Sequence, residues 1–299
     1  MTQCKKIMQQ TSKDLDSLIS HFKTRLFPYA YNIIGDSLAA EDLVHDVLNH
    51  YFIETPSHIR QPESYLTRAV INKAINHKNL LRTKLESYPG HWLPTPVLTE
   101  EIIYKRADQE EIINYSLLVL LEKLNAKERA VFILKETYEY SHEEIASILE
   151  IKTEHSRQLL KRSKEKLDRK QDLRSDYDLD QKKMLEQLTE AILNNNLEKV
   201  KNVLAEDVKT ISDGGEKVSA ARKMLIGPNR VTRFLQAIYG KYLPDSTQME
   251  FTKINHLPAI TFSVNGSVFR CMMFDIQKGQ IENIYIVVNP DKLQKLNTH

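Results

Sequence analysis

Apolar residues in the first 170 positions recur every three or four residues, which is the spacing of amphipathic helices. Asn125 and Ser141 are each followed three positions later by Glu, which is the spacing of a capping box at the start of a helix. The predicted helices run from Ser12 with an interruption at Pro28, over 38–52, over 63–83 after Pro62, and onward from Asn125, Ser141 and Thr153.

The apolar period changes from helical spacing to two in the last third of the chain. Two helices, a strand over 208–212 and a helix opened by Pro228 come first. The strands predicted after them are 249–255, 259–264, 268–276 and 281–289. Asn265-Gly266 and Lys278-Gly279 have the composition of tight hairpin turns. This order predicts an α+β domain of about 120 residues with a curled antiparallel sheet.

The helices beginning at Ser141 and Thr153 are separated by a short turn, which predicts a helix-turn-helix. The second helix is basic, because residues 152–170 contain eight Lys or Arg and three acids. A cationic recognition helix is typical of duplex DNA binding. We expect His155, Arg157 and Gln158 to contact base edges. We expect Lys161 and Arg162 to contact phosphates. The alternative is a basic surface helix in a small bundle.

Charge is polarised between the earlier helices. Residues 41–54 contain four acids and no Lys or Arg, whereas residues 60–84 contain six basic residues and one acid. Neighbouring helices of opposite sign indicate two different charged partners. The alternative is two solvated faces that attract one another.

The segment 85–110 is predicted to be a linker. Three prolines between Tyr88 and Pro96 are incompatible with a regular helix there. Trp92, which is the only tryptophan of the chain, lies in this segment. A large apolar ring is unfavourable in water, so we expect Trp92 to dock on a protein surface.

Composition excludes several classes of protein. With 299 residues the chain is long enough for two or three domains, and only 8 glycines argue against a turn-rich β fold throughout. Cys4 and Cys271 are too few for a disulfide framework or a cysteine-rich zinc site. Neither a P-loop nor a GxGxxG sequence is present, so we expect no nucleotide cofactor and no metal. The chain shows neither a signal peptide nor an apolar run that could cross a bilayer, which predicts a cytoplasmic protein without a membrane partner.

Three segments of the helical part carry motifs that resemble those of one known family. Ala30-Tyr31-Asn32-Ile33-Ile34-Gly35-Asp36 and the following Ala40-Glu41-Asp42-Leu43-Val44-His45-Asp46 are similar to the segment that binds core RNA polymerase. Pro62-Glu63-Ser64-Tyr65-Leu66, with Asn72-Lys73-Ala74, is similar to the promoter-melting segment. Residues 124–132 and 140–146 are similar to the helix-turn-helix domain. Together these segments resemble those of extracytoplasmic-function (ECF) sigma factors. The resemblance implies a sigma factor, not an enzyme, whose partners are core RNA polymerase and promoter DNA.

The resemblance also implies where those partners bind. The residues expected to contact core polymerase are Glu41, Asp42 and Asp46, with apolar area from Leu43 and Val47. The residues expected at the −10 element are Tyr65, Arg68, Asn72, Lys73, Asn76 and Lys78. The basic residues among them would meet phosphates, the amides would bond an extruded base, and Tyr65 would stack on one. The helix beginning at Thr153 would read the −35 element.

The last part is similar to the SnoaL-like α+β cone, and three short motifs are similar to those of an ECF subgroup that carries this extension. The residues of these motifs expected to make a regulatory contact are Trp92, Leu93, Pro94, Asp213, Gly214, Gly215, Lys217, Asn289, Pro290, Asp291, Lys292 and Leu293. Thr95 and Glu216 depart from the motifs. The resemblance implies that the cone regulates the sigma domains in cis, so that no separate anti-sigma factor is required.

Two other functions stay open from the residues alone. The chain could be a DNA-binding regulator that does not bind polymerase, although such a protein does not need the acidic segment 41–54. It could also be a small-molecule-binding or isomerase-type cone attached to a DNA-binding part, with Asp213 as candidate base. The predicted domains are 12–84 and 111–170 for the two sigma domains, joined by linker 85–110, then a connector over 171–178 and the cone over 179–299.

Overall fold

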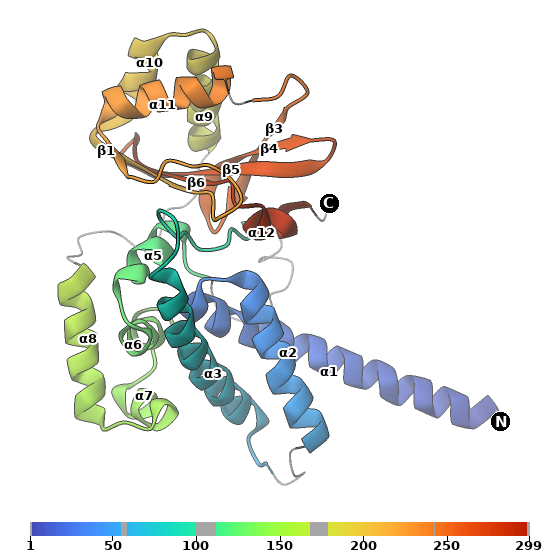
Figure 1. Cartoon of the computed structure of the whole chain (residues 1–299). Helices are drawn as coiled ribbons and strands as arrows, with labels where there is room; N and C mark the ends of the chain where they lie inside the picture. Colours follow the sequence, from blue (N-terminus) through green and yellow to red (C-terminus); the bar gives the residue numbers. More distant parts are fainter. Residues whose placement is uncertain (1, 55–58, 100–111, 168–178, 242, 298–299) are drawn as a thin grey trace. The chain divides into compact units, whose positions relative to one another are not determined.

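The computed structural model describes residues 2–54, 59–99, 112–167, 179–241 and 243–297. It divides into two compact units, of which the first is helical and the second contains all the strands described (Figure 1). Unit 1 comprises Met1–Arg82, Tyr104–Ile112 and Leu121–Arg169. Unit 2 comprises Thr83–Ile103, Ile113–Leu120 and Lys170–His299. Residues 85–99 of the predicted linker fall in unit 2, whereas 100–110 and the predicted connector 171–178 lie outside the described residues. No helix in the described ranges is long and apolar enough to cross a membrane.

Unit 1 begins with one long helix. Helix α1 (Thr2–Ile34) runs through Pro28, so the predicted interruption there is wrong. A proline removes a single backbone donor, and the helix is held on both sides of Pro28 by buried side chains such as Leu26 and Ala30. Gly35, with φ of 80°, then separates α1 from α2 (Ser37–Glu54), against which α1 packs.

The rest of unit 1 consists of α3 (Pro62–Leu85), whose last residues fall in unit 2, the 3-10 helix η1 (Leu121–Lys123), α6 (Ala126–Glu136), α7 (His142–Leu149) and α8 (Thr153–Leu167). Both predicted capping boxes are confirmed. Asn125 caps α6 together with Glu128, and Ser141 caps α7 together with Glu144. The turn between α7 and α8 starts at Glu150, which adopts a left-handed conformation with φ of 53°. Helices α7 and α8 form the predicted helix-turn-helix, and α6 packs against both.

Unit 2 is an α+β domain, as predicted. The elements before its sheet hairpins are α5 (Tyr115–Leu120), α9 (Leu179–Leu193), α10 (Leu197–Asn202), β1 (Leu204–Asp213), β2 (Leu225–Ile226) and α11 (Pro228–Lys241). The hairpins are formed by β3 (Gln248–Ile254), β4 (Leu257–Val264), β5 (Ser267–Gln277) and β6 (Gln280–Val287), and α12 (Pro290–Leu293) and the 3-10 helix η2 (Gln294–Asn297) end the described chain. Both predicted hairpin turns are confirmed, because Asn265-Gly266 and Lys278-Gly279 all have positive φ.

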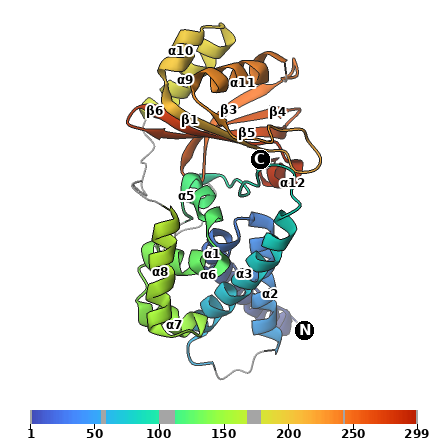
Figure 2. The same cartoon turned by 60° about the vertical axis from the view of Figure 1, so that its left-hand side comes forward.

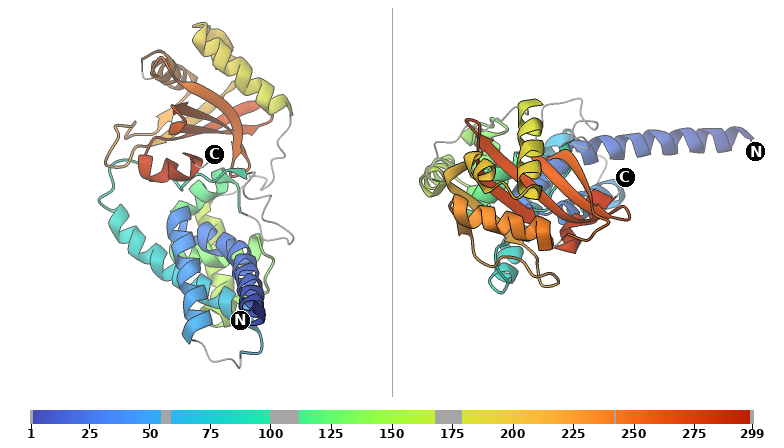
Figure 3. Two further views of the ribbon diagram at one scale, coloured as in Figure 1. Left: turned by 90° about the vertical axis from the view of Figure 1, so that its right-hand side faces the viewer. Right: turned by 90° about the horizontal axis from the view of Figure 1, so that it is seen from above.

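The sheet has the strand order β2-β1-β6-β5-β4-β3 and is visibly curved (Figure 3). It is mixed and not purely antiparallel as predicted, because β1 runs parallel to β6. The sequence pattern could not show this pairing, since the two strands are separated by α11 and three hairpin-connected strands. Helices α9, α10 and α11 cover one face of the sheet (Figure 2), where a core forms from residues such as Leu188, Leu235 and Phe274.

Candidate functional site

The acidic surface of unit 1 lies on α2. The side chains of Glu41, Asp42 and Asp46 are exposed, as a charged interface requires. Leu43 and Val47, in contrast, are only 8% and 3% exposed. They pack inside unit 1. The two residues are four positions apart, so they lie on the same side of α2, which is its apolar side and packs against α1. The expectation that they offer apolar area to a partner is therefore corrected.

The predicted −10 residues of α3 have different environments. Tyr65, Lys73 and Asn76 are exposed. Arg68 forms an ion pair with Glu150 at 2.5 Å, and the Asn72 amide donates a hydrogen bond to the backbone oxygen of Ile148 at 2.9 Å. Both contacts reach the C-terminal end of α7. In this arrangement, the helix-turn-helix occupies polar groups that were predicted to meet the −10 element.

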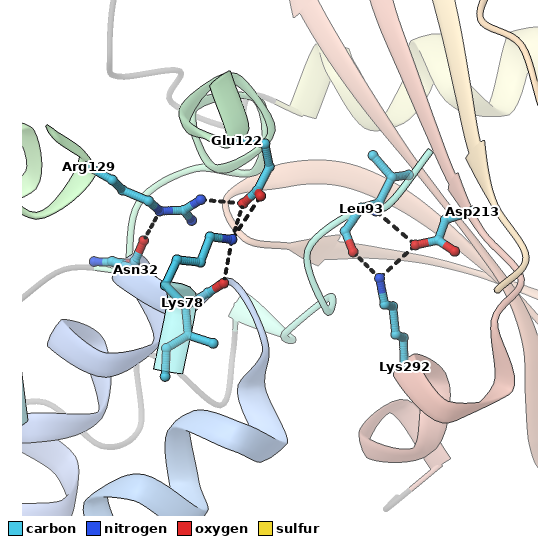
Figure 4. A network of polar contacts seen from close by, with 8 residues as sticks. Asn32, Lys78, Leu93, Glu122, Arg129, Asp213 and Lys292 are labelled. Atoms are coloured by element: carbon cyan, nitrogen blue, oxygen red, sulfur yellow. Dashed lines mark hydrogen bonds and ion pairs between the residues drawn. The ribbon is translucent and has the colours of Figure 1, made fainter. Parts of the chain in front are cut away.

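Lys78 is not a surface residue, which corrects its predicted contact with phosphate. Its side chain is buried, and its Nζ atom donates to the Ile34 oxygen at 2.9 Å and to the Glu122 carboxylate at 2.8 Å (Figure 4). Glu122 also pairs with Arg129, a fully buried residue whose Nε donates to the Asn32 oxygen at 2.8 Å. A buried ammonium with a carboxylate partner is too costly to expose for a phosphate contact.

The Lys78–Glu122–Arg129 cluster was not predicted as a set. Burial alone would raise the pKa of Glu122, but the charges of Arg129 and Lys78 and their hydrogen bonds more than offset this and hold that pKa below its usual value. The cluster joins α1, α3, η1 and α6 inside unit 1. The only sequence signal is that Arg129 directly precedes the apolar run Ala130-Val131-Phe132-Ile133, whose residues are expected to be buried.

The predicted −35 residues lie together on one exposed surface of α8. The residues on this surface are His155, Arg157, Gln158, Lys161 and Arg162. The opposite side of the helix holds Leu159, Ser163 and Leu167 in the core. Arg157 is held loosely by Glu143 at 3.3 Å and Glu154 at 3.4 Å, both exposed pairs of little energetic value. The helix thus presents cations outward on a scaffold fixed by its apolar side.

Unit 2 brings together residues of all three short motifs, around the carboxylate of Asp213 (Figure 4). Asp213 is 1% exposed and accepts from the Leu93 backbone N–H at 2.8 Å, from the Tyr88 hydroxyl at 2.5 Å and from Lys292 Nζ at 2.6 Å. Lys292 also donates to the Leu93 oxygen and lies 4.1 Å from the centre of the Trp92 ring. We call this group of Tyr88, Trp92, Leu93, Asp213 and Lys292 the linker clamp.

The two glycines of the turn after Asp213 are required because neighbouring atoms come too close for a side chain. A Cβ atom on Gly214 would lie 2.1 Å from the Val218 oxygen. A Cβ atom on Gly215, which has φ of 61°, would lie 2.5 Å from the Asn289 side chain. Asn289 in turn donates to the Tyr88 hydroxyl at 3.1 Å, so the turn and the tail meet the linker at one place.

The other motif residues surround the linker clamp. Pro94 is buried, and its oxygen accepts from the Tyr115 hydroxyl at 2.6 Å. Leu293 is buried in α12, whereas Pro290 is exposed. Lys217 and Asp291 form a surface ion pair at 2.6 Å, next to the turn. Burial and the neighbouring Asp213 raise the pKa of Tyr88, so its hydroxyl stays protonated and donates to that carboxylate.

Comparisons with known proteins show one matching family and several similar proteins. Residues 115–167 match the family described as sigma-70, region 4. The chain is 24% identical over 286 residues to the ECF RNA polymerase sigma factor SigJ of Mycobacterium tuberculosis, covering 90% of each protein. It is 22% identical over 274 residues to the probable ECF RNA polymerase sigma factor SigI of the same organism, covering 91% of this chain and 92% of SigI.

The fold agrees with a solved structure along nearly the whole chain. The crystal structure of M. tuberculosis SigJ superimposes with a TM-score of 0.72 and 22% identity, covering 93% of this chain and 98% of SigJ. The predicted fold class, a helical part followed by an α+β cone, is thereby confirmed. The chain is thus similar to ECF sigma factors over most of its length, and its helix-turn-helix lies in the segment that matches sigma-70, region 4.

Proposed function

We propose that this protein binds core RNA polymerase and directs promoter-specific initiation of transcription, under control of its own C-terminal domain. The observation that carries the proposal is the cationic surface of α8, which lies in the segment that matches sigma-70 region 4. A helix of this charge in a helix-turn-helix has the electrostatics needed to approach duplex DNA.

Polymerase binding is assigned to the acidic surface of α2. Glu41, Asp42 and Asp46 are exposed on one helix, and no shielding by Lys or Arg exists within residues 41–54. Charges of one sign on a rigid helix speed association with a surface of opposite sign and fix its register. A regulator that binds only DNA has no use for such a surface.

Control in cis is assigned to the linker clamp. It fixes the backbone of Leu93 through both its N–H and its carbonyl oxygen, using side chains that lie 120 and 199 residues further along the chain. An isomerase-type reaction finds less support, because Asp213, the candidate base, is buried and paired with Lys292. A base must be free to accept a proton from substrate.

The test is co-purification of the full chain with core RNA polymerase. Asp42→Lys with Asp46→Lys should abolish association, because attraction at that interface becomes repulsion worth several kcal/mol. The matched control is Glu186→Lys with Glu190→Lys, which makes the same charge change on exposed positions of α9. Equal recovery of polymerase by both double variants would refute the assignment of α2.

A further inference from the structure

Unit 2 contains a buried arginine for which the described residues supply no ion pair. Arg270 on β5 is only 9% exposed, and its Nε and Nη1 atoms are buried without a hydrogen-bond partner. Among the described residues, no carboxylate forms an ion pair with it. A buried guanidinium normally has its donors satisfied, since leaving a charge unpaired in a protein interior is strongly unfavourable.

A β-bulge sets the direction of this side chain. Phe262 on β4 pairs with Arg270, but Ser263 pairs with Val268, so Phe269 is an extra residue in β5. Bulges re-aim side chains and are common beside binding sites. The Arg270 guanidinium carbon lies 5.7 Å from the centre of the Phe262 ring and 5.5 Å from that of Phe269. The two rings hold the planar group in place, and its Nε and Nη1 atoms make no hydrogen bond within the described residues.

Two hydroxyl groups accompany the guanidinium. Tyr239 from α11 packs edge-on against Phe262 at 5.6 Å between ring centres, and it interacts electrostatically with Arg270. Thr189 from α9 lies close enough to Tyr239 for the two hydroxyls to interact, and that interaction lowers the pKa of Tyr239. Both hydroxyl oxygens are buried, and neither makes a hydrogen bond of regular geometry within the described residues. Burial raises the pKa of Tyr239 to about 12, so its hydroxyl is a neutral donor at physiological pH. Helices and sheet thus direct one cation and two hydroxyls to one region of the core.

We propose that the cone binds a small organic monocarboxylate here, with Arg270 as counter-ion and Tyr239 and Thr189 as hydrogen-bond donors. One guanidinium neutralises one negative charge, whereas a phosphate dianion would leave an excess charge among the apolar residues of this core. The aromatic rings of Phe262, Phe269 and Tyr239 suit an apolar body on the ligand. This site is separate from the linker clamp and does not depend on the proposed function.

The test uses the full chain with three carboxylates, namely formate, acetate and benzoate, at constant ionic strength. Their neutral amides and inorganic phosphate serve as comparison probes. Ligand-observed NMR measures affinity, and thermal unfolding checks it independently, because a ligand specific for the folded state raises Tm saturably. We expect at least one carboxylate to bind and its amide and phosphate not to bind.

Arg270→Met should abolish that binding, and Arg233→Met, an exposed arginine on α11, should leave it unchanged. Tyr239→Phe and Thr189→Val should each weaken it about fivefold, the worth of one hydrogen bond. If Arg270→Met does not fold, the two hydroxyl variants decide, and unchanged affinity in both overturns the proposal. Absence of carboxylate binding, equal binding of the amides, or tighter binding of phosphate also overturns it.

Discussion

The linker clamp depends on the Asp213 carboxylate, which makes Asp213→Ala its most informative perturbation. The carboxylate accepts from Leu93, Tyr88 and Lys292, and also from the Gly215 N–H at 3.0 Å. Its removal takes from the Lys292 ammonium, 6% exposed, the carboxylate with which it forms an ion pair. The Leu93 oxygen and the Trp92 ring, which Lys292 also contacts, are neutral and do not balance a full charge.

The expected loss follows from this burial. Removing one partner of a buried ion pair costs about 3–5 kcal/mol, because the other charge stays uncompensated. Lys292→Met should cost less, about 1–3 kcal/mol, since Asp213 keeps donors from Tyr88, Leu93 and Gly215. The double variant should be more stable than Asp213→Ala alone, because the stranded ammonium is gone.

Urea unfolding followed by tryptophan fluorescence measures these differences directly, since Trp92 is the only tryptophan and lies in the linker clamp. Asp245→Ala, which removes an exposed carboxylate of the same unit, is the control and should change the free energy of unfolding by less than about 0.5 kcal/mol. A cost below about 1 kcal/mol for Asp213→Ala, or a double variant as unstable as the sum of the single ones, would show that the pair is not coupled as the contacts indicate.

Three other predictions concern DNA, pH and the tail. Arg157→Ala should cost about 1–3 kcal/mol and relax preference at one base pair, whereas Lys161→Ala should weaken all promoters alike and lower the salt slope by about one; equal loss on every sequence for Arg157→Ala would contradict this. The pKa of Glu122 is lowered on folding, so its stabilisation is complete above its unfolded pKa of about 4.3 and is lost as pH falls through the folded value. Glu122→Gln should therefore reduce the loss of unfolding free energy as pH is lowered. The same loss at acid pH in Glu122→Gln as in the unaltered protein would refute this prediction. Ending the chain after Val288 should change promoter output in a reporter assay and expose the segment around Trp92 to protease, while unchanged output and cleavage would argue against control in cis.

Local signals in the sequence were enough for most of the fold. Asn125 and Ser141 cap helices because the cap and its Glu lie three residues apart, so the interaction needs no tertiary partner. The same holds for the turn at Asn265-Gly266, where positive φ is a property of two adjacent residues. The outward cations of α8 followed from helical period alone, because Leu159 and Leu167 fix which side is buried.

Two of the misses, at Lys78 and Arg270, depend on distant residues, whereas the one at Leu43 does not. Lys78 has the sequence context of a surface cation, and its burial is made favourable by partners such as the Ile34 oxygen and the Glu122 carboxylate, each 44 residues away. Leu43 was assigned to a partner, although its place on the apolar side of α2 already matched a core position. Arg270 stands in a strand of otherwise apolar period, and its surroundings come from α9, α11 and a bulge that no spacing rule shows.

The linker clamp uses a buried ion pair at a place where apolar packing would serve stability as well or better, because such pairs contribute little net free energy. What the pair adds is a defined geometry that two distant segments control separately. Asp213 holds the N–H of Leu93 from β1, and Lys292 holds its carbonyl oxygen from α12, near the end of the chain. Displacement of α12 would remove Lys292 from the Leu93 carbonyl oxygen and leave the Asp213 carboxylate without its ammonium partner. Asp213 would still accept from the Leu93 N–H. The linker would then be loosened in one step, without unfolding of the sheet that positions Asp213.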